Sequence, residues 1–304
     1  MNIESLGARM TVQLADFPEV STRPPVRDVY KGVEVLRHDP CGAEILNVDL
    51  AQPMAEGTFR AVMDIWHESL VICFRRQDIS AEDQLRFGRR IGELSVIHTP
   101  AFTGEDPAIM YISNVKKDGE FIHALPVGEM MFHIDQCYQA RPAKATILYS
   151  MKIPQTGGNT LFCDLQRAYD TLEEDTKLSL EGLKVLQVYD YDAGATHTAA
   201  AVADDAPRHV HPLVRTHPVT GRKCLYVNRL MTREVVGMDR AEGTALLARL
   251  FDHIENPAFV YEHRWQLGDL LMWDNRCTAH ARRDFNPEQD RVMRRLTVLG
   301  EVPV

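Results

Sequence analysis

The chain has 304 residues, of which 45% are hydrophobic and 25% charged, an ordinary composition for a globular protein with a large core. Thirty-four basic residues against 43 acidic ones give a formal net charge of −9. This balance argues against a general binder of nucleic acids or anionic membranes. An anionic ligand must therefore meet Arg or Lys side chains gathered at one place.

The six cysteines are scattered without paired spacing, so the sequence favours neither a zinc knuckle nor a disulfide framework. Residues 1–20 lack the basic start and apolar run of a secretory signal. No uninterrupted apolar stretch approaches the roughly 20 residues that span a bilayer. We therefore expect a protein of the reducing cytoplasm.

In chain order, paired prolines in residues 21–27 indicate an extended segment, and we expect an N-terminal arm over residues 1–28 followed by one domain over residues 29–304. Apolar residues at helical spacing predict a helix over residues 59–70, and Val71–Phe74 has the pattern of a buried strand. Ser80 can cap a second helix.

Short strand-like runs over residues 121–162, 209–227 and 259–298 are separated by Pro, Gly and Asn. Helical insertions are expected around 165–186 and 241–256. This order predicts a mainly β fold with flanking helices, either a sandwich or a barrel. Residues 190–207 have no clear period, and both a closing lid and a disordered loop fit them.

His133 and Asp135 are two residues apart, and side chains at that spacing on a strand point to the same side. With His280 as a third ligand they would form a two-histidine, one-carboxylate metal face, which leaves positions open on ferrous iron. The pair alone is weak evidence, because solvated side chains on a surface strand give the same pattern. His209 and His211, with Glu234 or Asp239, form a competing set that we interpret as structural.

Several segments repeat the motifs of one family at matching distances, and the chain resembles the taurine and 2,4-dichlorophenoxyacetate dioxygenase family (TauD/TfdA). The resemblance covers nearly everything after the N-terminal arm. The matching segments are residues 42–50, 132–135, 157–160, 273–276, His280 and 291–297.

The resemblance implies a double-stranded β-helix, or jelly-roll, core. It implies that His133, Asp135 and His280 are the catalytic iron ligands, and that Thr160 and Arg291 bind 2-oxoglutarate. Arg291 fits chemically, because a guanidinium matches a carboxylate with two hydrogen bonds. Two further residues, Arg295 and His98, fall near the family's substrate contacts. Residues 128–132 depart from the family pattern, which leaves the identity of the substrate open.

The implied cofactors are Fe(II), the cosubstrate 2-oxoglutarate and O2. The implied reaction hydroxylates a small carboxylate or sulfonate and gives succinate and CO2, with either a stable alcohol or cleavage of an ether, C–N or C–S bond. The family resemblance also implies a homo-oligomer, a dimer or a tetramer. A zinc-dependent hydrolase and a non-catalytic metal-binding barrel are the alternatives, but a zinc hydrolase gives Thr160 and Arg291 no evident role.

Overall fold

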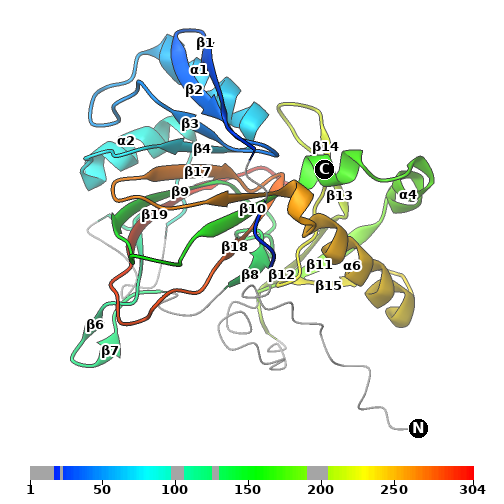
Figure 1. The fold of residues 1–304 in the computed structure, drawn as a ribbon. Helices are drawn as coiled ribbons and strands as arrows, with labels where there is room; N and C mark the ends of the chain where they lie inside the picture. The colour runs from blue at the N-terminus through cyan, green and yellow to red at the C-terminus, as the bar shows by residue number, and fades with distance from the viewer. Residues whose placement is uncertain (1–16, 21–22, 97–105, 125–129, 190–204) are drawn as a thin grey trace.

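The structure, a computed structural model, describes residues 17–20, 23–96, 106–124, 130–189 and 205–304. Two facing β-sheets form its centre (Figure 1). The larger sheet has eight strands, and its neighbours are antiparallel except for one parallel pair. Its strands in spatial order are β1 (Val26–Tyr30), β2 (Val33–Arg37), β3 (Ala43–Ile45), β4 (Val71–Phe74), β17 (Leu270–Asp274), β9 (Ala143–Lys152), β19 (Val292–Leu299) and β5 (Met110–Ser113).

The smaller sheet has four antiparallel strands. They are, in spatial order, β16 (Val260–His263), β10 (Thr160–Asp164), β18 (Thr278–Arg282) and β8 (Met130–His133). Side chains of both sheets share one buried core, in which the rings of Phe162 on β10 and Trp273 on β17 lie 5.4 Å apart. This two-sheet arrangement is that of a jelly roll.

Two helices cover the outer face of the large sheet, α1 (Glu56–Ser69) and α2 (Ala81–Ile91) (Figure 1). They bury a second core, which joins Trp66 of α1 and Phe87 of α2 to Ile147 and Leu296 of the sheet. Ser80 and Asp83 form a reciprocal capping box at the start of α2, which satisfies backbone donors that a helix end leaves unpaired.

Most of the further helices and short strands lie beside the four-stranded sheet, whereas the β6–β7 pair projects apart from them at the lower left of Figure 1. The helices are α3 (Leu165–Asp170), α4 (Glu174–Leu180), α6 (Arg240–Ile254) and the 3-10 turn η4 (Pro257–Phe259). The strands are β11 (Lys184–Val188), β12 (Arg208–Pro212) and β15 (Thr232–Val235) in one sheet, β13 (Val214–Thr216) with β14 (Lys223–Leu225), and β6 (Lys116–Lys117) with β7 (Glu120–Phe121). No helix in the described part of the chain is long and apolar enough to cross a membrane.

The predicted helix over residues 59–70, the strand Val71–Phe74 and the Ser80 cap are confirmed. The helical insertion expected over 165–186 is wrong in its last six residues, because α4 ends at Leu180 and β11 follows. Gly182 takes a positive φ of 75° there, a conformation that ends a helix, and Val185 is buried in the strand.

The other insertion, expected at 241–256, is α6. The last three residues of the arm expected over 1–28 belong to β1, which pairs with β2 along its whole length. Of the loop expected over 190–207, residues 190–204 lie outside the described residues.

Candidate active site

The three predicted metal ligands meet between strands β8 and β18. His133 ends β8 and stands opposite His280 in the β18 register, and their rings lie 4.0 Å apart. The Nε2 atoms of His133 and His280 are 3.9 Å and 3.8 Å from the two carboxylate oxygens of Asp135. These separations leave room for one ion at ligand distances of about 2.1 Å.

Asp135 reaches this place in a different way from the one predicted. Strand β8 ends at His133, so Asp135 lies in the turn after it and not at the next position of the same strand face. The turn continues through Gln136, which has a positive φ of 54°. The predicted grouping is correct, but a turn brings the carboxylate back to the imidazole.

The protonation states of these side chains fit a divalent metal. Nδ1 of His133 lies 2.9 Å from the carbonyl oxygen of Met131, which can only accept, so Nδ1 carries the proton. In a neutral ring Nε2 then has a free lone pair, and this atom is the one that faces Asp135. Burial lowers the pKa of His133 and of His280. Burial opposes ionisation of Asp135, but the charge of Arg295 keeps its pKa below the usual value. Two neutral imidazoles beside one carboxylate are what such an ion requires.

A chain of buried hydrogen bonds fixes the Asp135 carboxylate. Thr146 on β9 donates to its Oδ2 at 2.6 Å. Asn275 donates to the Thr146 hydroxyl at 2.9 Å, and the Trp273 indole donates to Asn275 at 3.0 Å. Arg295 contacts the other carboxylate oxygen at 2.9 Å. The large sheet thus orients a ligand carried by the small one.

Two other groups of three buried side chains in the described residues have metal-binding types, Cys73 with His263 and Asp269, and His217 with Asp274 and Cys277. In each group a histidine Nε2 lies at hydrogen-bond distance from the carboxylate, 3.1 Å between His263 and Asp269 and 3.0 Å between His217 and Asp274, which leaves no gap for an ion between them. We therefore assign both groups a structural role.

The competing set around His209 and His211 is not among the metal-type groups of the described residues. His211 forms a hydrogen bond to the carbonyl of Gln139 at 2.9 Å, and its ring packs against Tyr226. These contacts support the structural interpretation of this pair.

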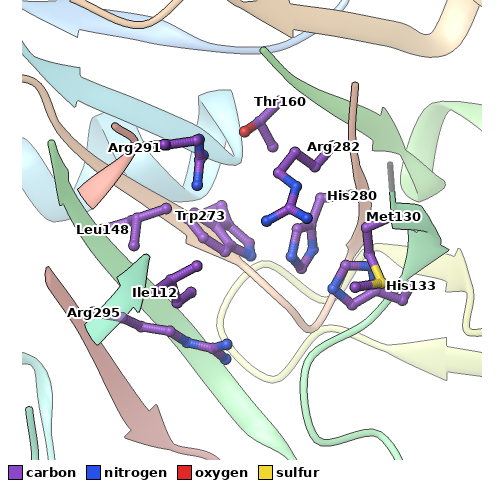
Figure 2. A pocket seen from close by; sticks show the side chains of 10 residues that line it. All are labelled: Ile112, Met130, His133, Leu148, Thr160, Trp273, His280, Arg282, Arg291 and Arg295. Carbon is purple, nitrogen blue, oxygen red and sulfur yellow. The ribbon is translucent and has the colours of Figure 1, made fainter. Parts of the chain in front are cut away.

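Thr160 and Arg291 line one cavity together with both histidines (Figure 2). The Thr160 hydroxyl accepts a hydrogen bond from the Trp265 indole at 3.0 Å, so its own proton is available to a ligand oxygen. The double glycine before Thr160 makes space for Arg291, because a Cβ on Gly158 would lie 3.3 Å from the Arg291 Nε. Burial, and then the positive charge of Arg282, lower the pKa of Arg291.

Arg295 and its chain neighbour Arg294 face opposite sides of β19. Arg295 lines the cavity. Arg294 donates to Gln84 Oε1 at 2.7 Å on helix α2, as the alternation of a strand requires. His98 lies outside the described residues, so its predicted substrate contact stays a prediction.

The cavity is apolar apart from its two histidines, Thr160 and three arginines. Its lining consists of Ile112, Met130, His133, Leu148, Thr160, Trp273, His280, Arg282, Arg291 and Arg295. No carboxylate is part of this lining among the residues that the structure describes. A small anion is the complementary ligand.

The sequence model of the "Taurine catabolism dioxygenase TauD, TfdA family" matches residues 33–297. The chain belongs to this family.

Individual members of the TauD/TfdA family agree along most of their length. An alpha-ketoglutarate-dependent 2,4-dichlorophenoxyacetate dioxygenase of Cupriavidus pinatubonensis is 33% identical, over 88% of this chain and 97% of that protein. The crystal structure of a putative alpha-ketoglutarate-dependent taurine dioxygenase from Burkholderia xenovorans has a TM-score of 0.76 at 29% identity and covers 90% of this chain and 91% of its own. The crystal structure of AAD-2 in complex with Mn(II) and N-oxalylglycine has a TM-score of 0.73 at 30% identity. The match covers 92% of this chain and 99% of that chain.

The TauD/TfdA membership confirms the predicted jelly-roll core and the predicted class of enzyme. The protein is a 2-oxoglutarate-dependent dioxygenase that uses Fe(II), 2-oxoglutarate and O2. The zinc hydrolase and the non-catalytic barrel find no support in these relatives. The roles of individual residues in metal and cosubstrate binding stay predictions.

Sequence reasoning missed one charged side chain of this cavity's described lining, Arg282. It lies two positions after His280 on β18 and directly opposite Thr160 in the β10 register. The i, i+2 rule that was applied to His133 would have found it, because strand neighbours at that spacing share a face. Thr146 carried no such signal, since its contact to Asp135 depends on how the two sheets face each other.

Proposed function

We propose that His133, Asp135 and His280 bind Fe(II), that Thr160 and Arg291 bind the distal carboxylate of 2-oxoglutarate, and that a small anionic substrate is hydroxylated beside them. The observation that carries this proposal is that His133 and His280, which form a metal-type cluster with Asp135, line one cavity together with Thr160 and Arg291. Each residue type suits its proposed partner, a divalent ion or a carboxylate.

When bound, the iron supplies the activation of O2 that couples oxidative decarboxylation of 2-oxoglutarate, to succinate and CO2, with insertion of one oxygen atom into a substrate C–H bond. The chain's own residues provide placement. The Thr160 hydroxyl donates a hydrogen bond to the carboxylate, and the planar guanidinium of Arg291 donates hydrogen bonds to the same group. The apolar lining from Ile112, Leu148 and Trp273 excludes water from an oxidising reaction.

For the substrate, we propose a small carboxylate or sulfonate whose anion contacts Arg295. The relatives' names support this class, since one names 2,4-dichlorophenoxyacetate and another taurine, both of which carry one anionic group. Arg295 lines the cavity and already contacts an anion, the Asp135 carboxylate. If the new hydroxyl is placed on a carbon that bears O, N or S, the product loses that group and the bond is cleaved.

We also propose a cytoplasmic location and a homo-oligomeric state. All six cysteines are free and buried, which suits a reducing compartment. Light scattering on the purified protein measures the oligomeric state directly.

The first experiment adds Fe(II) and 2-oxoglutarate to the metal-free protein under nitrogen and records the visible spectrum. We expect a weak charge-transfer band that requires both additions, since it arises from a keto acid chelated to the metal. His133→Ala should abolish the band, whereas His209→Ala, which changes a histidine outside the cavity, should keep it. Succinate release is then measured with small acids and their neutral methyl esters, and we expect only the acids to stimulate it.

Absence of the band in the wild-type protein despite bound iron would overturn the proposed cosubstrate site. A full band in His133→Ala would overturn the ligand assignment. Equal stimulation by acids and esters would remove the case for an anionic substrate while leaving the metal site intact.

A further inference from the structure

We propose that Arg282 is a second 2-oxoglutarate-binding residue, which binds the distal carboxylate together with Arg291 and Thr160. This inference rests on the proposed function, because it takes Thr160 and Arg291 as the cosubstrate end of the cavity. It adds a residue that the sequence motifs did not assign.

The backbone register brings Arg282 to this end of the cavity. Arg282 on β18 and Thr160 on β10 are direct cross-strand partners, and both side chains line the cavity. Partners of this kind have Cβ atoms roughly 5 Å apart, so one carboxylate can reach the hydroxyl and the guanidinium together. Figure 2 shows Arg282 extending from the Thr160 side toward the space above Trp273 and His280.

Arg282 and Arg291 also lie near the same aromatic ring. Their guanidinium carbons lie 5.7 Å and 5.8 Å from the centre of the Phe285 ring. Both arginines are more than nine-tenths buried. Two buried guanidinium groups repel each other, and a carboxylate between them offsets that repulsion while it accepts hydrogen bonds from both.

The position of Arg282 favours the cosubstrate over the primary substrate. Arg295, the proposed substrate contact, pairs with Asp135 at 2.9 Å and lies in the lower half of Figure 2, whereas Thr160, Arg291 and Arg282 lie in the upper half. The cavity therefore has two separate cationic ends. 2-Oxoglutarate carries a second carboxylate that must lie away from the metal. Arg282 lies at the end of the cavity where Thr160 and Arg291 would bind that carboxylate.

The test measures equilibrium binding by calorimetry on Fe(II)-loaded protein under nitrogen. The two ligands are 2-oxoglutarate and 2-oxopentanoate, a keto acid of the same chain length without the distal carboxylate. We expect Arg282→Met to weaken 2-oxoglutarate binding by about 10- to 100-fold, the loss of one charge-assisted hydrogen bond. Binding of 2-oxopentanoate should not change, and Arg282→Lys should recover part of the lost affinity.

Arg283→Met is the matched control, because Arg283 faces the other way and pairs with Glu262 at 3.0 Å. Unchanged 2-oxoglutarate affinity in Arg282→Met would overturn the inference. Equal weakening of both keto acids would also overturn it, because it would show damage to the site and not loss of a carboxylate contact. Arg291→Met in the same titration tests the proposed function separately. If Arg291→Met binds 2-oxoglutarate as tightly as the wild-type protein, Arg291 is not the anchor, and this conclusion does not depend on the result for Arg282→Met.

Discussion

At the scale of single residues, the site depends on side chains that never touch the ion. One carboxylate oxygen of Asp135 accepts a hydrogen bond from Thr146, and the other pairs with Arg295. Both the orientation and the negative charge of the carboxylate are therefore fixed before a metal binds. Such outer contacts orient a ligand and tune its basicity. They are also the part of the site that motif matching does not find.

We therefore expect Thr146→Val, which keeps the shape and removes the hydroxyl, to weaken metal binding by about 10- to 100-fold. Thr146→Ser should restore most of the affinity, because it keeps the hydroxyl. Titration of the metal-free variants with Fe(II) under nitrogen measures the change. If the Thr146→Val variant and the wild-type protein bind Fe(II) equally well, the hydrogen bond of 2.6 Å from Thr146 to Asp135 does not contribute to positioning the carboxylate.

At the scale of elements, a buried ion-pair cluster joins three neighbouring inner strands of the large sheet to the small sheet. Arg75, just after β4, contacts Glu44 on β3 at 2.7 Å and Asp269, just before β17, at 2.6 Å. His263 on β16 also reaches Asp269, at 3.1 Å. Breaking one member leaves the other charges buried and uncompensated, which is costly.

Glu44→Gln should lower the free energy of unfolding at pH 7 by about 1–3 kcal/mol. Burial opposes ionisation of Glu44, but hydrogen bonds from His38 and Arg75 lower its pKa from 4.5 to about 2. Because the folded pKa is the lower one, this stabilisation is complete above pH 4.5 and is lost as the pH falls toward 2.

Urea unfolding of wild type and Glu44→Gln across this pH range checks the prediction. Glu34→Gln on β2 serves as control, because its ion pair with Arg27 is exposed and should contribute little. A difference between wild type and Glu44→Gln that stays constant from pH 7 to pH 2.5 would contradict the charge-based explanation.

At the scale of the whole molecule, the residues that a resemblance could identify are those whose chemistry restricts their type. His133, Asp135, His280 and Arg291 were predicted because metal and carboxylate binding tolerate few alternatives. The jelly-roll core followed from the same motifs, since strand patterns alone left sandwich and barrel open.

What the sequence did not reveal are contacts between distant parts of the chain. Asn275 bonds to Thr146 across 129 positions, and nothing in either segment indicates the other. The helix expected to continue to 186 became β11 because pairing with two neighbouring strands outweighed local pattern. Tertiary packing decided these features.

The place of β8 in its sheet has a consequence for local stability. β8 is last in the four-stranded order and, among the strands of the described residues, pairs with β18 alone. His133 ends this strand, and Asp135 follows in the turn after it. A bound ion would add a link between His133 at the end of β8 and its partner His280 on β18, and any ligand that binds the folded form selectively opposes its opening. The metal would thus hold an edge strand closed as well as support chemistry.

Hydrogen exchange with and without Fe(II) under nitrogen would show this directly. Removing the metal should speed exchange at the amides of β8, while β9, paired on both sides, should keep its protection. Equal protection of β8 in both states would mean that the strand is held by its own packing. If the expected difference is found, iron loss first becomes visible as local opening of one strand, long before the fold itself is lost.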